Sequence, residues 1–170
     1  MIISILASTN TGGIGNRGTL PWPKHSEDMK WFKDHTENQI VVMGRNTWDD
    51  PKMPKPLPNR INCVVSGRHV AQQYQHQVRW IPSSPVENIL QLQKDNPIKD
   101  VYIIGGKQLY EATESIVERV YLTRIKGAWF TDTRIQLDSM LACFQIKSVR
   151  PGENCTYETW DRTMFFTQVV

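Results

Sequence analysis

Apolar residues along the chain gather in short runs, and helical spacing appears in the stretches between them. The runs are Ile2–Leu6, Ile40–Met43, Cys63–Val65, Val78–Ile81, Val101–Ile104 and Val120–Ile125. Several of them are continuous rather than alternating, which is typical of strands buried on both faces of a sheet. The pattern therefore predicts an α/β fold with a mainly parallel central sheet and helices on both faces.

Two helices are predicted clearly. One begins at Ser26 or Glu27, and its residues Asp28, Met29, Trp31, Phe32 and His35 recur at helical spacing. The other follows Ser84-Pro85-Val86-Glu87, which has the form of a capping box with proline at the first helical position. We expect this second helix to run to about Asp95.

The tail of the chain has the alternation and turn residues of antiparallel strands. The predicted strands are Phe144–Arg150, Thr156–Trp160 and Met164–Val169, with a turn at Pro151-Gly152-Glu153-Asn154. Pro51–Pro58 contains four prolines and predicts a stiff extended loop that could hinge two lobes. Its length does not require a separate domain, so residues 1–170 are expected to form a single domain with a C-terminal antiparallel β-hairpin.

Composition narrows the class of protein. With 39% hydrophobic and 22% charged residues, the chain has the balance of a soluble globular protein. Its net charge of +3 suits a small polyanionic ligand, but no basic stripe interleaved with aromatic residues indicates nucleic acid. Met1–Ala7 is too short for a membrane span and lacks a basic start, so it is interpreted as a strand rather than a signal peptide.

Cysteine and histidine give no metal or disulfide pattern. Cys63, Cys143 and Cys155 form neither an even framework nor a CxxC pair, which indicates free thiols in a reducing compartment. The four histidines, His25, His35, His69 and His76, show no metal-ligand spacing. We expect a cytoplasmic protein that contains no metal.

Three predicted strands end in turns that suit anions. These turns are Met43-Gly44-Arg45, Val65-Ser66-Gly67-Arg68 and Ile104-Gly105-Gly106-Lys107. Ligands of open α/β sheets bind outside the carboxyl ends of the strands, where glycine lets backbone N–H groups approach a phosphate. One such turn alone would be an ordinary turn with a solvated charge. Three together indicate a ligand with several phosphates, such as a dinucleotide, although no G-x-G-x-x-G motif is present.

Asp28 is the second chemical signal. Helical spacing places it one turn before Phe32, on or beside the apolar stripe of its helix. A carboxylate that faces a pocket loses solvation and needs a partner. A first-turn acid can also simply stabilise the helix dipole, a role that Glu27 fits better.

Taken in order, the motifs of the chain resemble those of dihydrofolate reductases. They are Leu20-Pro21-Trp22, Asp28-Met29-Lys30-Trp31-Phe32-Lys33 with Thr36, Val42-Met43-Gly44-Arg45-Asn46-Thr47-Trp48, Pro56-Leu57-Pro58-Asn59-Arg60, Ile103-Ile104-Gly105-Gly106 with Tyr110, Tyr121-Leu122-Thr123, and Asp132-Thr133. No single motif is decisive, but their order and spacing match the family from residue 1 to about 135. The resemblance implies reduction of 7,8-dihydrofolate to 5,6,7,8-tetrahydrofolate, with hydride passing from NADPH to C6 and a proton to N5.

The resemblance also implies roles at the substrate site. Asp28 would hold the pterin through paired hydrogen bonds, and Thr123 would orient its carboxylate. Arg60 would clamp the α-carboxylate of the glutamate tail, and Leu57 would touch the aminobenzoyl ring. The implied catalytic residues are Asp28, Thr123, Trp22 and Leu20, and the other substrate contacts are Ile5, Leu6, Ala7, Met29, Phe32, Leu57, Arg60, Ile104 and Tyr110. Whether Asp28 delivers the proton through water or only raises the basicity of N5 stays open.

For the cofactor, the resemblance implies that Gly105-Gly106 is a cis pair against the pyrophosphate. The pair Arg45 and Arg68 favours the 2′-phosphate of NADPH over NADH. Residues 12–22, which include Ile14 and Leu20, would form a mobile loop that closes over the nicotinamide. The full implied set is Ala7, Ile14, Gly15, Leu20, Gly44, Arg45, Asn46, Thr47, Val65, Ser66, Gly67, Arg68, Ile104, Gly105, Gly106, Lys107, Gln108, Leu109, Tyr110 and Asp132. We expect dihydrofolate as the only partner of a monomer that binds neither nucleic acid nor membrane.

The chain departs from the family pattern in several loops. The segment before Asp28 is one residue longer than in many relatives, and the stretch 50–55 is extended, so the pattern does not say which of its residues faces substrate. Asn59 and Thr131 replace frequent glycines, and Lys107 and Gln108 follow the glycine pair where other residues are usual. These differences bear on loop closure and inhibitor affinity rather than on the reaction.

Two other classes of protein share some of these features. A pyrimidine reductase of riboflavin synthesis shares the fold and NADPH, but its substrate has no glutamate tail for Arg60 to clamp. A non-catalytic interaction module would not need Asp28, Thr123 and the glycine pair together. Both alternatives therefore explain fewer of the residues.

Overall fold

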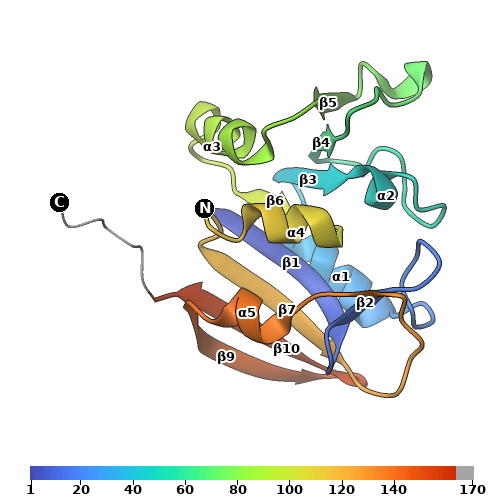
Figure 1. Cartoon of the computed structure of the whole chain (residues 1–170), viewed down its shortest axis with the longest axis vertical. Helices are drawn as coiled ribbons and strands as arrows, with labels where there is room; N and C mark the ends of the chain where they lie inside the picture. Colours follow the sequence, from blue (N-terminus) through green and yellow to red (C-terminus); the bar gives the residue numbers. More distant parts are fainter. Residues whose placement is uncertain (164–170) are drawn as a thin grey trace.

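The computed structural model describes residues 1–163, which form an α/β fold around an eight-stranded sheet of order β5-β4-β3-β6-β1-β7-β10-β9 (Figure 1). The strands are β1 (Ile2–Thr9), β3 (Ile40–Gly44), β4 (Ile61–Val65), β5 (Val78–Ile81), β6 (Val101–Ile103), β7 (Arg119–Ile125), β9 (Phe144–Gly152) and β10 (Cys155–Arg162). From β5 to β7 every neighbouring pair is parallel, whereas β10 pairs antiparallel with both β7 and β9. The prediction of a mainly parallel sheet with a C-terminal hairpin is confirmed.

The predicted strands inside the described residues all form, with small differences at their ends. Val78–Ile81 has the predicted bounds, while β1 continues past Leu6 to Thr9. The hairpin turn is shorter than predicted, because the strands extend until only Glu153 and Asn154 remain in the turn. The short strands β2 (Gly13–Gly15) and β8 (Thr133–Arg134) were not predicted, and the predicted strand Met164–Val169 lies outside the described residues.

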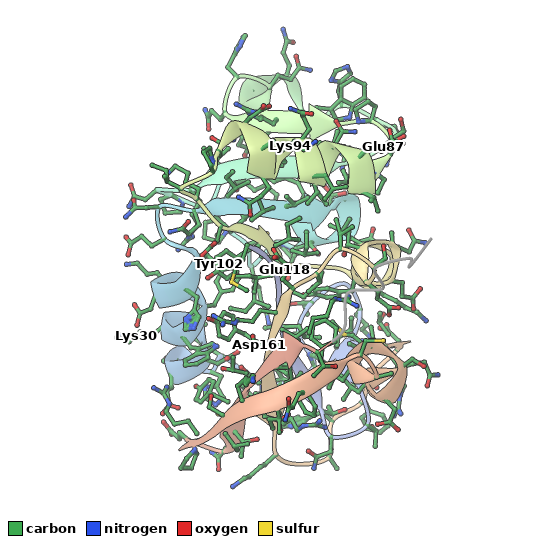
Figure 2. All side chains as sticks on the ribbon, turned by 90° about the vertical axis from the view of Figure 1, so that its left-hand side faces the viewer. Lys30, Glu87, Lys94, Tyr102, Glu118 and Asp161 are labelled. Atoms are coloured by element: carbon green, nitrogen blue, oxygen red, sulfur yellow. The ribbon has the colours of Figure 1, made fainter. Side chains whose placement is uncertain are left out.

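Helices cover both faces of the sheet. They are α1 (Ser26–Thr36), α2 (Arg45–Trp48), the 3-10 turn η1 (Gln72–Tyr74), α3 (Pro85–Asp95), α4 (Lys107–Thr113) and α5 (Leu137–Leu141). In Figure 1, α4 and α5 lie in front of the sheet and α1 lies behind it. Figure 2 shows Lys30 pointing outward from α1, so the opposite side of this helix faces the sheet. None of the helices within residues 1–163 has the length and apolar character that a membrane crossing requires.

The predicted capping box before α3 is wrong, although the helix itself is confirmed. Ser84 has φ of 53°, a left-handed conformation, and its side chain makes no capping hydrogen bond. An N-cap side chain reaches the first turn only from an extended backbone, which Ser84 lacks. The amide of Asn88 instead donates to the carbonyls of Ser83 and Ser84, at 3.0 Å each.

The core has one apolar layer on each side of the sheet. Along β1, Ile2 and Leu6 pack toward α3, α4 and α5, while Ile3 and Ile5 pack toward α1 and α2. Residues 40–43 of β3 are all fully buried. The continuous apolar runs therefore reflect burial on both faces, as the sequence predicted.

Candidate active site

A carboxylate and a hydroxyl meet at the carboxyl end of β7. The hydroxyl of Thr123 on β7 donates a 2.8 Å hydrogen bond to Oδ1 of Asp28, which lies in the first turn of α1. In the sheet, Thr123 pairs with Ala7 of β1, so the pair lies beside the end of the central strand. The family resemblance implied that these three residues lie at one site, and the structure brings them together.

Burial sets the charge properties of Asp28. Loss of solvent raises the pKa of its carboxyl group, while the hydrogen bond from Thr123 and the nearby His25 act in the opposite direction. Among residues 1–163, this carboxylate makes no salt bridge. A partly buried acid held by one hydroxyl is suited to a ligand that supplies N–H donors.

The strand ends beside Asp28 form an apolar wall. Ile5 is buried on the α1 side, Ala7 is partly exposed, and the hydroxyl of Tyr110 donates to the carbonyl of Ile5 at 2.9 Å. This bond ties α4 to β1. Leu6, also predicted to contact substrate, instead packs on the opposite face of the sheet, because side chains alternate along a strand. Ile104 continues the wall at the end of β6, next to β1 in the sheet.

The glycine pair lies directly after β6. The Gly105-Gly106 peptide is cis, which confirms the expectation from the resemblance. The N–H of Gly44 donates to the carbonyl of Gly105 at 2.7 Å, so the turns after β3 and β6 are joined. Gly105 has φ of 125°, and an added Cβ would lie 3.1 Å from Oγ1 of Thr47 and 3.4 Å from the Tyr110 hydroxyl. A side chain at this position is therefore both strained and crowded.

The turns after β3 and β4 carry the two predicted arginines. Arg45 is already occupied, since its Nε donates to the Asp49 carboxylate at 3.0 and 3.1 Å and its Nη1 donates to the carbonyl of His69 at 3.1 Å. Arg68 is exposed, and within the described residues its guanidinium makes no ion pair. Arg45 thus holds the turn after β4 in place. The guanidinium of Arg68 is exposed to solvent, where it could bind a phosphate.

An aromatic stack stands beside the turn after β4. The indole N–H of Trp80 donates to the carbonyl of Ser66 at 2.8 Å, and the His69 ring lies 3.6 Å from that of Trp80, centre to centre. The Ser66 hydroxyl accepts from the N–H of Arg68 at 3.1 Å. The stack gives this turn a flat apolar wall next to a cation, which suits a nucleotide.

On the far side of α1, Arg60 and Leu57 lie at the base of the proline-rich loop. Asn62 holds this loop, because its side chain accepts from the N–H of Leu57 at 3.0 Å and donates to the Leu57 carbonyl at 2.9 Å. The Arg60 guanidinium lies 5.8 Å from the centre of the Phe32 ring, and its Nε is buried with no acceptor among residues 1–163. Burial lowers the pKa of this guanidinium.

A hollow of about 300 Å³ opens next to Arg60. It is lined by Asn38, Gln39, Asn59, Arg60, Ile61 and Lys99, and Nζ of Lys99 donates to the carbonyl of Asn38 at 2.6 Å. Amides and two cations around one hollow suit a carboxylate.

The loop after β1 is fastened to the loop before β8. The N–H of Arg17 donates to Oδ2 of Asp132 at 2.8 Å, and this bond, with that from the Thr133 hydroxyl, lowers the pKa of Asp132. Asp132 was expected at the cofactor, and in the structure it holds this loop. Ile14 is partly buried, Gly15 pairs with Thr133, and Leu20 is 47% exposed just after the bridge between Asn16 and Thr19.

Trp22 closes the inner end of that loop. It is buried in a small cluster with Tyr157 and Cys155, against which Ala7 packs. Its indole N–H is buried and has no acceptor among residues 1–163. A buried donor without an acceptor costs free energy, which sets this N–H apart from the satisfied polar groups of the core.

The remaining predicted contacts differ in accessibility. Met29 is 54% exposed, and Asn46, Gly67, Lys107 and Gln108 are also exposed. Leu109 packs its side chain in the core, which leaves only its backbone for a ligand. Thr47, Val65, Ser66 and Gly106 are partly exposed at the strand ends, as a binding surface requires.

Three residues of the site were not found from sequence. Asn62, Trp80 and His25 each hold another site residue through a hydrogen bond. Only Asn62 carried a visible signal, because it is an amide inside an otherwise apolar strand. The partners of Trp80 and His25 are set by the tertiary fold.

Fold and site together are typical of an α/β reductase that uses a dinucleotide. A family model described as dihydrofolate reductase matches residues 1–160, and the chain belongs to this family. Dihydrofolate reductase type 9 of Escherichia coli is 36% identical over 135 residues, covering 78% of this chain and 75% of the relative. Dihydrofolate reductase of Buchnera aphidicola is 35% identical over 126 residues, or 74% and 73% of the two chains.

A solved structure shares the whole fold. Dihydrofolate reductase from Enterococcus faecalis, complexed with NADP(H), superposes with a TM-score of 0.83 at 28% identity, covering 96% of this chain and 97% of that one.

Proposed function

We propose that this chain reduces 7,8-dihydrofolate to 5,6,7,8-tetrahydrofolate, with NADPH as the hydride donor. The observation that carries the proposal is the Asp28 carboxylate, withdrawn from solvent and held by Thr123 beside the end of β1. A pterin presents an amino group and a ring N–H side by side, and one carboxylate can accept from both. The family match of residues 1–160 supports the same chemistry.

The residues at the strand ends fit the cofactor. The crowding around Gly105 leaves room for backbone but not for a Cβ, which is the kind of cradle that lets a pyrophosphate approach N–H groups. Arg68 and Ser66 would hold the 2′-phosphate, and Arg45 would fix their turn. When bound, NADPH supplies the hydride.

The chain's own residues manage the proton and exclude water. A raised pKa keeps a fraction of Asp28 protonated closer to neutral pH, where an acid near N5 is useful. Ile5, Ala7 and Phe32 would flank the flat ring, and the loop that ends at Trp22 would cover it. Closing the site strengthens each polar contact inside it.

The protein is proposed to act as a monomer in the cytoplasm. Every residue assigned to the site comes from one chain, so no second copy is needed to complete it. The three cysteines are unpaired, and burial raises the pKa of Cys63 to about 12, which keeps that thiol protonated and inert.

Turnover tests the proposed function directly. Purified protein should consume NADPH only when dihydrofolate is added. The reaction is monitored as the loss of absorbance of the reduced nicotinamide. The full chain should show a strong preference for NADPH over NADH. Absence of cofactor consumption with dihydrofolate at high concentration would refute the proposal.

Substitution of Arg60 tests the tail contact. Arg60→Ala should raise the KM for dihydrofolate by about ten- to a hundredfold, the cost of losing a charge-assisted pair, with a smaller effect on kcat. A pteridine without a glutamate tail should be reduced equally well by both proteins. Arg79→Ala, an exposed arginine of β5, is the matched control. Equal losses with both substrates would remove Arg60 from the tail site.

A further inference from the structure

His25 joins two parts of the fold immediately before the catalytic helix. It is the N-cap residue of α1, and its Nδ1 accepts the backbone N–H of Asp28 at 3.1 Å. Its Nε2 lies 2.6 Å from the carbonyl oxygen of Glu153, in the turn between β9 and β10. Glu153 is 128 residues away in sequence, so the ring bridges the start of α1 to the far end of the hairpin.

The two bonds require one protonation state. Nδ1 must carry a lone pair to accept the Asp28 N–H, so the proton of the neutral ring is on Nε2. That proton is then donated to the Glu153 carbonyl. A second proton on Nδ1 would face the Asp28 N–H with another donor and remove the cap.

We propose that His25 is a positioning residue for Asp28: its neutral ring holds the first turn of α1 against the hairpin, and protonation of the ring releases that turn. The carboxylate of Asp28 and its backbone N–H belong to one residue. Freedom gained at the N–H therefore moves the carboxylate relative to Thr123, and a small displacement of a reacting group lowers the rate steeply. This inference rests on the proposed role of Asp28 in dihydrofolate reduction.

A second contact makes the same connection without a histidine. The Glu27 carboxylate accepts from the N–H of Glu153 at 3.2 and 3.3 Å. The pKa of Glu27 is lowered most by the Tyr157 hydroxyl and next by this backbone N–H. Glu27 therefore stays ionised to lower pH than an ordinary glutamate and keeps the helix near the hairpin. Loss of the His25 cap should then disturb the position of Asp28 rather than unfold the protein.

The charged residues around the ring come from three segments. They are Glu27 and Asp28 on α1, Glu153 in the hairpin turn, and Arg150 on β9, which acts on the same Glu27. The ring therefore lies next to two carboxylates of the first turn of α1.

Two substitutions separate the cap from the charge. His25→Ala removes the acceptor and should lower kcat about three- to tenfold at neutral pH, with NADPH affinity unchanged. His25→Asn restores an acceptor for the Asp28 N–H and should recover most of the rate, because asparagine is a favourable N-cap. His76→Asn, at an exposed position after η1, is the matched control.

The pH profile provides the decisive readout. At the acidic end of the profile the wild-type rate should decline, because a proton on Nδ1 removes the acceptor for the Asp28 N–H, while that of His25→Asn should level off. In an Asp28→Asn background, His25→Ala should cause no further loss, because the carboxylate it positions is absent. Wild-type turnover with NADPH shows independently that the enzyme works.

Three results would overturn the assignment. They are a kcat of His25→Ala within twofold of wild type, an acidic decline in His25→Asn that matches wild type, or an undiminished His25→Ala effect in the Asp28→Asn background. If His25→Ala fails to fold, the comparison of wild type with His25→Asn decides alone. Thermal unfolding of each variant separates loss of fold from loss of position.

Discussion

Replacing Asp28 with asparagine should lower the rate of hydride transfer at neutral pH by about a hundred- to ten-thousandfold. Asparagine keeps the shape of the side chain and an oxygen that can accept from Thr123, but it cannot supply a proton or carry the charge that holds the pterin. NADPH should bind as in wild type, because its proposed contacts lie at the other strand ends. Single-turnover measurements across pH would test this. The wild-type rate should fall as pH rises and Asp28 loses its proton, and that dependence should be absent in the variant.

The same variant should be at least as stable as wild type at neutral pH. Burial raises the pKa of Asp28, so the folded state binds this proton more tightly than the unfolded state. Stability contributed by this group therefore falls as pH rises from the ordinary aspartate value of about 3.9 through the raised folded value. Asparagine has no such penalty. Thermal unfolding should show its advantage near neutral pH and its disappearance in acid, and a lower melting temperature at neutral pH would contradict the account.

Gly105→Ala should weaken NADPH binding by at least tenfold and also lower the melting temperature. The backbone at φ of 125° is costly for a residue with a Cβ, by about 1–3 kcal/mol, and Oγ1 of Thr47 lies only 3.1 Å from the added atom. The turn must move, and its link to Gly44 must move with it. Fluorescence titration with NADPH and thermal unfolding of the unliganded protein would measure the two effects.

The adjacent glycine provides the comparison for that experiment. Gly106 has φ of −95°, and its nearest neighbour would be Oγ1 of Thr47 at 3.8 Å, an ordinary contact. Gly106→Ala should therefore leave the melting temperature close to wild type, whatever it does to the cofactor. Equal destabilisation by the two substitutions would show that the crowding at Gly105 is not what restricts this position.

The sheet could be predicted because its signal is local. A strand buried on both faces has apolar residues at successive positions, and Ile40–Met43 shows this directly. The turns at Gly44 and Gly105 could be placed at one edge because the carboxyl ends of neighbouring parallel strands meet there. Asp28 could be selected because one polar residue interrupts the apolar stripe of an amphipathic helix.

What sequence could not show was how residues far apart satisfy one another. The Ser84 pattern has the letters of a capping box, but the preceding loop places its backbone in a left-handed conformation that no local pattern reveals. Arg45 was expected to meet a phosphate, yet Asp49 one turn later and the carbonyl of His69 already bind it. The partner of His25 is a backbone carbonyl, which carries no sequence signature at all.

The fold places the two halves of its central polar pair at distant points of the chain. Asp28 lies in the first helix and Thr123 in the seventh strand, 95 residues later. Contacts of such long range form slowly, because the entropy cost of closing a large loop precedes the stabilisation that the contact provides. During refolding, enzymatic activity should therefore appear only when β7 has joined the sheet. The circular dichroism signal of α1 should appear well before that. The rate at which turnover is recovered would thus report the rate of the final folding step.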